Sequence, residues 1–407
     1  MRRQQASDPT IESARQTTRF MMLYALAWSG GAIGYVPFLT LLLPAKVTEL
    51  TGADAVAWLS YIAFVGAISA SVANVGFGWL SDYTRSRRAF VFAGLIVSCL
   101  LLMSVAHIDR PGPLLLHIAL WQFALNMMLS PLAAWAGDCV PNRQKGRLGG
   151  LLSFAPAIGG LSGALVTMPA LALSRDAQPA LVAGLVAACV LPVLFLGRPV
   201  AMPQLMVDHV SAGPKSTTGA ARGPSAVAKM WASRLLIQIA EASLFAFLLL
   251  WLRSLDEAMG ENETARLYSL VVLVAVPLAL WLGRWADKRQ RPILPLAGTA
   301  VICVIGLAGM AISGSLAGGV ASYMIFGVAG AVFLSLHSAQ TLRVLPRART
   351  RGRDLGFFNL TNTVPSLIMP WLTLALVPTF GFAGLFALLA AMAALASTLL
   401  FSVSRRK

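Results

Sequence analysis

GWLSDYTRSRR, residues 78–88, ends one long apolar segment, and GRWADKRQRP, residues 283–292, ends another. In both stretches a glycine stands four positions before an aspartate, and basic residues follow the aspartate. The two aspartates, Asp82 and Asp287, are 205 residues apart. A second pair of basic loops, PNRQKGRLG at 141–149 and PRARTRGRDLG at 346–356, repeats at nearly the same spacing. This duplication predicts two related membrane halves, a pattern that is typical of transporters built from repeats.

The composition places the chain in a membrane. It is 57% hydrophobic and only 12% charged, with a mean hydropathy of +0.74, whereas a soluble chain carries about 25% charged residues. A segment of about 20 apolar residues crosses a bilayer core of about 30 Å as a helix, because lipid cannot satisfy free backbone groups. We therefore expect an all-α membrane protein with twelve transmembrane helices, at residues 20–43, 57–80, 89–106, 113–137, 148–173, 179–197, 231–252, 265–283, 292–313, 320–340, 355–377 and 381–403.

The basic residues are distributed unevenly between the two predicted sides of the membrane. Of the 32 lysine and arginine residues, 27 fall in the termini and in the loops that follow even-numbered segments, and 5 fall in the remaining loops. This asymmetry predicts a multi-pass protein of a bacterial-type inner membrane with both termini in the cytoplasm. It also accounts for the net charge of +16 without nucleic acid as a partner, which we exclude. The first apolar segment is too long for the core of a cleaved signal peptide, so we expect it to be retained.

A polar stretch separates the two halves. SAGPKSTTGAARGPS at 211–225 has the composition of a flexible linker, with six apolar segments before it and six after it. The chain is thus expected to comprise a cytoplasmic N-terminal segment (1–19), an N-terminal six-helix bundle (20–197), a cytoplasmic central linker (198–230), a C-terminal six-helix bundle (231–403) and a cytoplasmic tail (404–407).

Two six-helix halves, a long basic central loop and the doubled loop signature resemble the major facilitator superfamily (MFS) over essentially the whole chain. SDYTRSR at 81–87 and RGRDLGFFN at 351–359 are similar to loops of glycoside–cation symporter relatives. PAIGG at 156–160 is weakly similar to the core of the antiporter motif of drug–proton exporters. The resemblance implies the MFS fold, with two pseudo-symmetric halves that alternate access to a central site. The two finer likenesses imply opposite directions of transport.

The repeated signature has a physical interpretation as a gate. Glycine allows helices to approach closely, and an aspartate at a helix end accepts charge-assisted hydrogen bonds from basic neighbours. The alternative interpretation is that these basic loops only fix the topology. The resemblance implies a cytoplasmic gate formed by Gly78, Asp82, Arg88, Gly283, Asp287 and Arg291.

Glu241 lies deep inside a predicted span, near the middle of residues 231–252. An ionisable group at this depth costs several kcal/mol unless it is paired or hydrated, so it is a functional candidate. Arg234, Gln238 and Glu241 share one helix face, which Phe245 continues. We predict that Glu241 carries the coupled proton, with His337 as a second candidate because imidazole titrates near neutral pH. The alternatives are a structural Glu241 that pairs with another helix and a His337 that is only hydrated near the cytoplasm.

The resemblance also implies that the first, fourth, seventh and tenth spans line a central cavity. A mixture of aromatic and amide side chains suits a small, partly apolar organic molecule, although aromatic residues also anchor helices at membrane interfaces. The candidate cavity residues, including two on the eleventh span, are Trp28, Tyr35, Gln122, Asn126, Gln238, Tyr323, Asn359 and Asn362. Proline and glycine inside spans permit bending and repacking. The predicted helix hinges are Pro156, Gly159, Gly160 and Pro365.

The sequence contains no glycine-rich nucleotide loop, catalytic triad or metal-ligand spacing, and its four cysteines are scattered singly. We therefore expect no enzyme activity, no metal and no cofactor. The sequence predicts a secondary transporter of a small organic solute that works by alternating access as a monomer, with proton coupling, and with export slightly preferred. Two alternatives stay open: an uptake symporter or facilitator for a glycoside or another organic nutrient, and an MFS-like accessory protein that senses a ligand or delivers a pigment or cofactor.

Overall fold

The computed structural model describes residues 15–152, 154–200, 224–289, 293–344 and 351–404, and all regular structure in these residues is helical. The first half of the chain forms α2 (Thr18–Pro37), α3 (Leu43–Thr51), α4 (Ala55–Tyr83), α5 (Arg87–Ser104), α6 (Pro111–Cys139), α7 (Asn142–Leu152), α8 (Ala155–Val166) and α9 (Ala177–Leu196). The second half forms α11 (Pro224–Leu255), α12 (Glu261–Lys288), α13 (Leu294–Ile312), α14 (Leu316–Val344) and α15 (Arg351–Ser404). The predicted all-α membrane fold is thereby confirmed.

Nine stretches of the described chain are long and apolar enough to cross a membrane. Two of them are divided by a glycine with positive φ: Gly52 (55°) ends α3 within Thr18–Tyr83, and Gly381 (63°) interrupts α15 within Val364–Val403. Glycine adopts this backbone conformation without the strain that a side chain would add. Each of the twelve predicted segments overlaps a helix. The number of membrane crossings stays a prediction.

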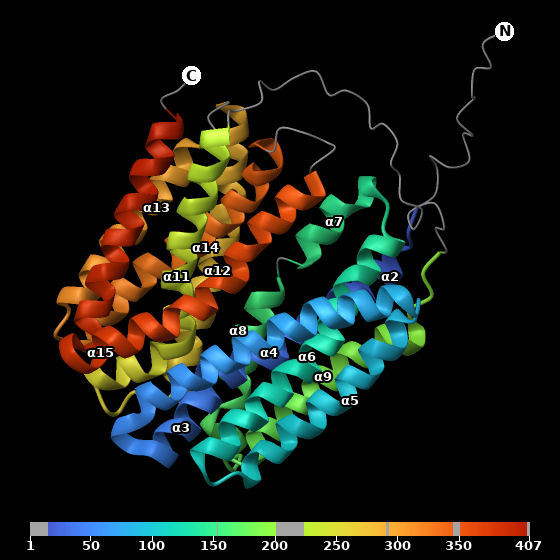
Figure 1. Ribbon diagram of the computed structural model, residues 1–407, viewed down its shortest axis with the longest axis horizontal. Helices are drawn as coiled ribbons and strands as arrows, with labels where there is room; N and C mark the ends of the chain where they lie inside the picture. Colours follow the sequence, from blue (N-terminus) through green and yellow to red (C-terminus); the bar gives the residue numbers. More distant parts are fainter. Residues whose placement is uncertain (1–14, 153, 201–223, 290–292, 345–350, 405–407) are drawn as a thin grey trace.

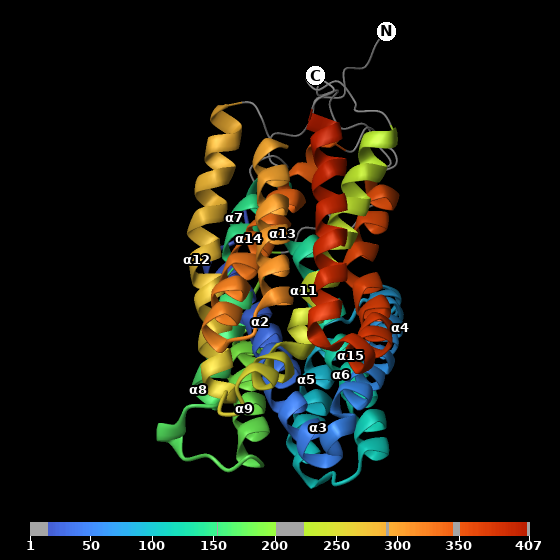
Figure 2. The same cartoon turned by 90° about the vertical axis from the view of Figure 1, so that its left-hand side faces the viewer.

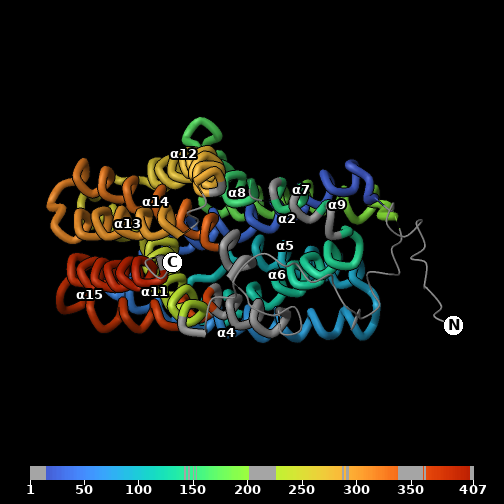
Figure 3. The backbone as a smooth tube through the Cα atoms, turned by 90° about the horizontal axis from the view of Figure 1, so that it is seen from above, coloured from blue at the N-terminus to red at the C-terminus, as the bar shows by residue number. Residues whose placement is uncertain are grey.

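The helices gather into two bundles, each built around a large hydrophobic core, and Phe247 of α11 and Met369 of α15 join the core of the first bundle. The core of α2–α9 includes Trp121 against Phe38, with ring centroids 4.8 Å apart, and the core of α11–α15 includes Trp251 against Phe386, with centroids 4.9 Å apart. Figure 3 shows the two bundles side by side, and we call them the N half and the C half. Most of the predicted central linker lies outside the described residues, so the predicted domain boundaries stay predictions.

Corresponding helices of the two halves approach each other at a glycine. A Cβ atom added to Gly94 of α5 would collide with the backbone of Met128 on α6. A Cβ atom added to Gly306 of α13 would collide in the same way with the backbone of Phe326 on α14. The helix pairs α5–α6 and α13–α14 are the third and fourth predicted spans of their halves. The shared glycine contact therefore supports the prediction that the two halves are built alike.

Side-chain contacts define one end of the molecule. Gln16, just before α2, donates to the carbonyl of Cys139 at the end of α6 (2.9 Å) and accepts from the backbone N–H of Val200 after α9 (3.0 Å). In the C half, Lys229 near the start of α11 donates to Ser402 near the end of α15 (2.7 Å). We call this end the terminal end, because α2 begins there and α15 ends there (Figure 1).

The two halves contact each other toward the opposite end. Arg175, between α8 and α9, lies 4.0 Å from Glu261 at the start of α12. Next to it, Asn262 of α12 donates to the carbonyl of Ala164 on α8 (2.8 Å). Helices α8 and α12 pack against each other (Figure 2). Figure 1 shows the two halves converging around α8 and α11 and diverging toward the terminal end.

Candidate functional site

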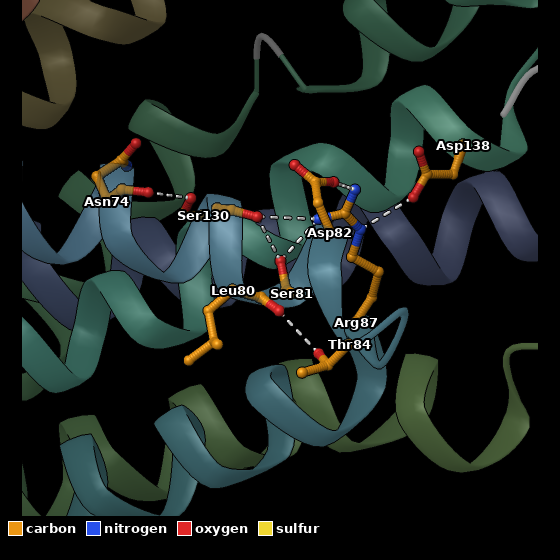
Figure 4. A network of polar contacts seen from close by, with 9 residues as sticks. Asn74, Leu80, Ser81, Asp82, Thr84, Arg87, Ser130 and Asp138 are labelled. Carbon is orange, nitrogen blue, oxygen red and sulfur yellow. Dashed lines mark hydrogen bonds and ion pairs between the residues drawn. The ribbon is translucent and has the colours of Figure 1, made fainter. Parts of the chain in front are cut away.

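Arg87 holds the first copy of the loop signature together at the terminal end of the N half (Figure 4). This side chain of α5 forms ion pairs with Asp82 of α4 and with Asp138 of α6, the second with an Nε–Oδ2 distance of 3.0 Å. Its Nη1 also donates to the hydroxyl of Ser81 (2.6 Å). The Arg87 side chain is 13% exposed, whereas that of Asp82 is 63% exposed. Arg87 therefore ties three helices of one half together and leaves part of Asp82 accessible.

Arg88, the predicted gate residue, contacts other helices. Its guanidinium donates to the carbonyl of Gly197 after α9 and lies 5.1 Å from the ring centre of Trp135 on α6. Sequence reasoning missed the central role of Arg87, because three arginines stand close together here. Only the turn at Arg85, which has a φ of 52°, determines which of them faces Asp82. The gate roles of Asp82 and Arg88 stay predictions.

The two signature glycines have different surroundings. A Cβ atom on Gly78 would lie 3.0 Å from the Ser130 hydroxyl of α6, whereas one on Gly283 would lie 3.7 Å from Leu336 of α14, an ordinary contact. The close approach that the sequence predicts is therefore present at Gly78. The side chain of Asp287 and the whole of Arg291 lie outside the described residues, so the second half of the gate stays a prediction.

Arg234, Gln238 and Glu241 form the polar face of α11 that the sequence predicts, and we call them the polar stripe. The polar stripe contacts α14 and α15. Nε of Arg234 donates to Oε1 of Gln238 (3.1 Å) and to the hydroxyl of Thr361 on α15 (3.0 Å), and its Nη1 lies 3.5 Å from Nδ1 of His337. The buried His337 ring also contacts the carbonyl of Met230 through Nε2 (3.0 Å). A carbonyl only accepts, so Nε2 carries the proton and Nδ1 accepts from Arg234. Both contacts thus fit a neutral imidazole.

The polar stripe of α11 and its contact residues on α14 have the same spacing along their helices. Glu241 is seven residues after Arg234 on α11, and Gly330 is seven residues before His337 on α14. Because the two helices run in opposite directions, Arg234 lies opposite His337 and Glu241 lies opposite Gly330. A Cβ atom at Gly330 would collide with Oε1 of Glu241. Glycine at this position therefore provides the space in which the carboxyl group lies between the two helices.

Glu241 has an unusual environment for a carboxyl group. Its Oε1 atom is buried and has no hydrogen-bond partner among the residues that the structure describes, although part of the residue remains accessible. Tyr268 of α12, Cys303 of α13 and Tyr323 of α14 are near enough to interact with it electrostatically. Tyr323, a predicted cavity residue, is itself buried. The structure therefore places the predicted proton carrier between α11 and α14, with ionisable groups of α12 and α13 within electrostatic range.

Aromatic side chains of both halves meet near this part of α11. Trp28 and Tyr35 of α2, Phe245 of α11 and Tyr268 of α12 pack around small residues of α2 and α8, and we call these four residues the aromatic cluster. The ring centroids of Tyr35 and Phe245 are 6.2 Å apart. Tyr268 belongs to the cluster and also interacts electrostatically with Glu241. Phe245 of the cluster is four residues after Glu241 on the same face of α11, so the cluster begins about one helical turn from the carboxyl group. Sequence reasoning missed Tyr268, because the eighth span was not expected to line the cavity.

The predicted amides of the N half lie at the contact between α4 and α6. Nδ2 of Asn126 donates to the carbonyl of Gln122, and its Oδ1 lies 3.4 Å from Nδ2 of Asn74 on α4. Asn126 and Gln122 therefore form one polar group on α6, separate from the aromatic cluster. The side chains of Asn359 and Asn362 lie outside the described residues, so their predicted role in the cavity stays a prediction.

Two of the predicted hinge residues lie where α8 packs against its neighbours, Gly159 against α2 of the same half and Gly160 against α12 of the other half. A Cβ atom on Gly159 of α8 would be 2.9 Å from a side chain of α2, and one on Gly160 would be 2.9 Å from Tyr268 of α12. Pro156 stands in the first turn of α8, after the break from α7, and Pro365 lies within α15. Helix α8 thus packs closely between both halves, while bending at these positions stays a prediction.

A polar contact at the end opposite the terminal end was not predicted. Asn262 is 5% exposed and donates across the halves to Ala164, while its own Oδ1 is buried without a partner among the described residues. Glu261 lies 3.2 Å from Arg253 of its own half and 4.0 Å from Arg175 of the other. The sequence contained a weak signal, an acidic cluster at 256–263, which on its own is typical of a solvated loop. We call Glu261, Asn262, Arg175 and Ala164 the opposite-end contact.

The fold and this site define a multi-pass membrane transporter with a polar and aromatic centre between two helical halves. The family model of the Major Facilitator Superfamily matches residues 20–335, so the chain belongs to this family. No curated protein is a match to the chain. Among the described residues, no group of three or more His, Cys, Asp or Glu side chains could hold a metal ion.

Several solved structures share the fold at low sequence identity. The peptide transporter POT in complex with sulfate is 15% identical, with a TM-score of 0.73, over 98% of this chain and 99% of that chain. A bacterial homologue of the human lysosomal transporter Spinster, in an inward-facing and occupied conformation, is 12% identical, with a TM-score of 0.71, over 99% and 98%. A mutant of the nucleoside transporter NupG is 14% identical, with a TM-score of 0.70, over 94% and 99%. These likenesses establish the fold.

Proposed function

We propose that the protein moves a small, partly apolar organic solute across a bacterial-type inner membrane by alternating access, coupled to protons. The observation that carries this proposal is the Glu241 carboxyl group, which lies one helical turn from Phe245 of the aromatic cluster and has one buried oxygen unpartnered among the described residues. A carboxylate at such depth is costly unless it is neutral, paired or hydrated. A group that must gain or lose a proton when its surroundings change is suited to couple proton movement to a conformational change.

The terminal end faces the cytoplasm in this proposal, because 27 of the 32 basic residues belong to it by the predicted topology. The two hydrogen bonds and the ion pair between the halves, among described residues, lie at the opposite end. This conformation is then the one with access from the cytoplasm. The likeness to a Spinster homologue solved in an inward-facing conformation supports this assignment.

Transport would require the opposite-end contact to break while the terminal ends of the halves approach each other. Asp82 keeps an accessible carboxylate for that closed state, and Arg88, Asp287 and Arg291 are the further proposed gate residues. His337 is a weaker candidate for proton coupling than Glu241, because its two ring nitrogens are already engaged as in a neutral imidazole. The protein would act as a monomer in the lipid bilayer.

Proton coupling is tested in liposomes that contain the reconstituted protein and a pH-sensitive dye. Probes of different chemistry are added in turn: uridine, dialanine, methyl β-glucoside and tetraphenylphosphonium. We expect at least one probe to move protons in the wild type, and Glu241→Gln to abolish this movement while exchange of the same probe continues, with a lower affinity where the probe is a cation. The control is Glu257→Gln, which removes a carboxylate from an exposed loop. Unchanged proton movement in Glu241→Gln would reject Glu241 as the carrier.

Direction is tested separately in cells. Export, which we prefer by a narrow margin, predicts that gene deletion raises sensitivity to a toxic compound. Uptake of a glycoside or another nutrient, as symporter or facilitator, predicts a growth defect on that nutrient. A non-transporting accessory protein predicts that a ligand binds without any flux in liposomes.

A further inference from the structure

The ionisable groups nearest to Glu241 are neutral or negative. Tyr268 of α12, Cys303 of α13 and Tyr323 of α14 are within electrostatic range of its carboxyl group, and Tyr35 of α2 interacts with Tyr268. Arg234 of α11 and His337 of α14 lie further along the same two helices. Tyrosine and cysteine are neutral or negative in any protonation state, and the contacts of His337 fit a neutral ring. Arg234 is the one cation of this set. It lies two turns along the helix, about 10 Å by helical rise, and its guanidinium is bonded to Gln238, Thr361 and His337.

When it is ionised, the Glu241 carboxylate therefore has no nearby positive partner among the described residues. An anionic ligand at this point would meet the carboxylate and the phenol oxygens. A neutral ligand would leave an ionised carboxylate uncompensated, so the carboxyl group would have to stay protonated. A cationic ligand would supply the missing charge, because a buried charge is stabilised when it is paired.

The aromatic cluster supplies the second part of such a site. Trp28, Tyr35, Phe245 and Tyr268 come from both halves and pack around the same residues of α2 and α8, with Phe245 one helical turn from Glu241 on α11. The faces of tryptophan, tyrosine and phenylalanine attract an organic cation within about 6 Å of the ring centre. Aromatic side chains also provide apolar surface for the body of a ligand. A carboxylate next to several aromatic rings is the combination that binds an ammonium group better than a neutral group of the same shape.

We propose that the substrate is an organic cation with an apolar or aromatic body, whose charged group pairs with Glu241 and whose body packs against the aromatic cluster. This inference rests on the proposed transport function and adds the substrate class. Binding exchanges one charge for another: the protonated Glu241 carboxyl group releases its proton, and the resulting carboxylate pairs with the cation. Proton and substrate then compete for the same group. The released proton leaves toward the side that is open at that moment.

The test compares two probes of nearly equal size and shape but opposite charge, tetraphenylphosphonium and tetraphenylborate, and a smaller cation, benzyltrimethylammonium. Binding to the purified protein in detergent is measured by calorimetry, and proton release is measured with an indicator in weak buffer. We expect at least one of the cations to bind at least tenfold more tightly than tetraphenylborate. We also expect about one proton to be released for each cation bound.

Three variants separate the parts of the site. Glu241→Gln should weaken cation binding at least tenfold and abolish proton release, whereas Glu257→Gln in an exposed loop should change neither. Phe245→Leu keeps an apolar side chain but removes an aromatic face, so it should weaken cation binding by about 2- to 20-fold. Loss of fold is excluded by an unchanged thermal melting profile in detergent.

The outcomes distinguish this inference from the proposed function. Equal or tighter binding of the anion, or cation binding that Glu241→Gln leaves unchanged, would overturn the cation site. If neither cation binds while uridine, dialanine or methyl β-glucoside drives Glu241-dependent proton flux in liposomes, the transport proposal stands and the cation class is wrong. If a cation binds at Glu241 and releases a proton but no flux occurs, the binding site stands and the transport proposal is wrong.

Discussion

Replacing Gly330 with alanine tests whether the packing of Glu241 against α14 matters for transport. The added Cβ would lie well under 3.0 Å from Oε1 of Glu241, closer than Cβ atoms approach their neighbours in proteins. The carboxyl group must then move by about 1 Å, and it moves readily because it is the end of a flexible side chain. A displacement of about 30° from a rotamer costs about 0.5–1.5 kcal/mol. This corresponds to a factor of about 2–10 in an equilibrium constant.

We therefore expect Gly330→Ala to lower proton-coupled flux in liposomes by about 2- to 10-fold. Glu241→Asp shortens the acidic side chain by one carbon–carbon bond, about 1.5 Å, and so restores the space that the alanine takes. The double variant should transport no more slowly than Glu241→Asp alone, which gives a coupling energy of about 0.5–1.5 kcal/mol in a double-mutant cycle. The matched control is Gly318→Ala on the same helix, where a Cβ meets serine oxygens only at 3.3 Å.

Three results would refute this reasoning. Wild-type flux in Gly330→Ala would show that the position of the carboxyl group is unimportant. Additive losses in the double variant would show that Gly330 acts through helix packing in general and not through Glu241. A loss in Gly318→Ala as large as that in Gly330→Ala would lead to the same conclusion.

Three further predictions concern the contacts that hold the helices. Arg87→Ala leaves two aspartates without their shared partner. It should lower the stability of the N half by only about 1 kcal/mol, because one of the two ion pairs is largely exposed. The thermal unfolding midpoint in detergent measures this loss. Asn262→Ala removes a buried hydrogen bond between the halves, worth about 1 kcal/mol. The equilibrium between the two conformations should therefore shift about 5-fold toward the one that is open at the opposite end. Distances between spin labels on the two halves measure this shift. Gly160→Ala places a Cβ 2.9 Å from Tyr268 and should shift those distances in the same direction.

Matched variants control these predictions. Arg85→Ala removes an exposed arginine from the same turn and should leave the unfolding midpoint unchanged. Gly184→Ala adds a Cβ that meets nothing within 4 Å and should leave the spin-label distances unchanged. An unfolding midpoint equally lowered by Arg85→Ala would contradict the network around Arg87. Distances unaffected by Asn262→Ala and Gly160→Ala would contradict the role of the contact between the halves.

The hydrophobic pattern predicted the helices well, because lipid leaves the backbone few alternatives to a helix. The duplicated loops predicted the family for a related reason: a glycine and an aspartate at fixed spacing recur only where two halves share one architecture. Glu241 could be selected from the sequence, since a carboxylate inside an apolar segment is costly wherever the neighbours lie. These inferences depend on local composition and spacing, which a linear sequence displays directly.

The neighbours of Glu241 could not be selected in this way. Gly330 and Tyr268 are ordinary residues of apolar spans until helix packing brings them to the carboxyl group. Arg87 and Arg88 are adjacent in the sequence, and only the turn before α5 directs one to the aspartates and the other to α9. Composition and repetition thus determined that the chain is a duplicated helical membrane transporter. The tertiary structure decided which side chains share the buried charge, because pairing across helices depends on register and rotation, which the order of residues does not contain.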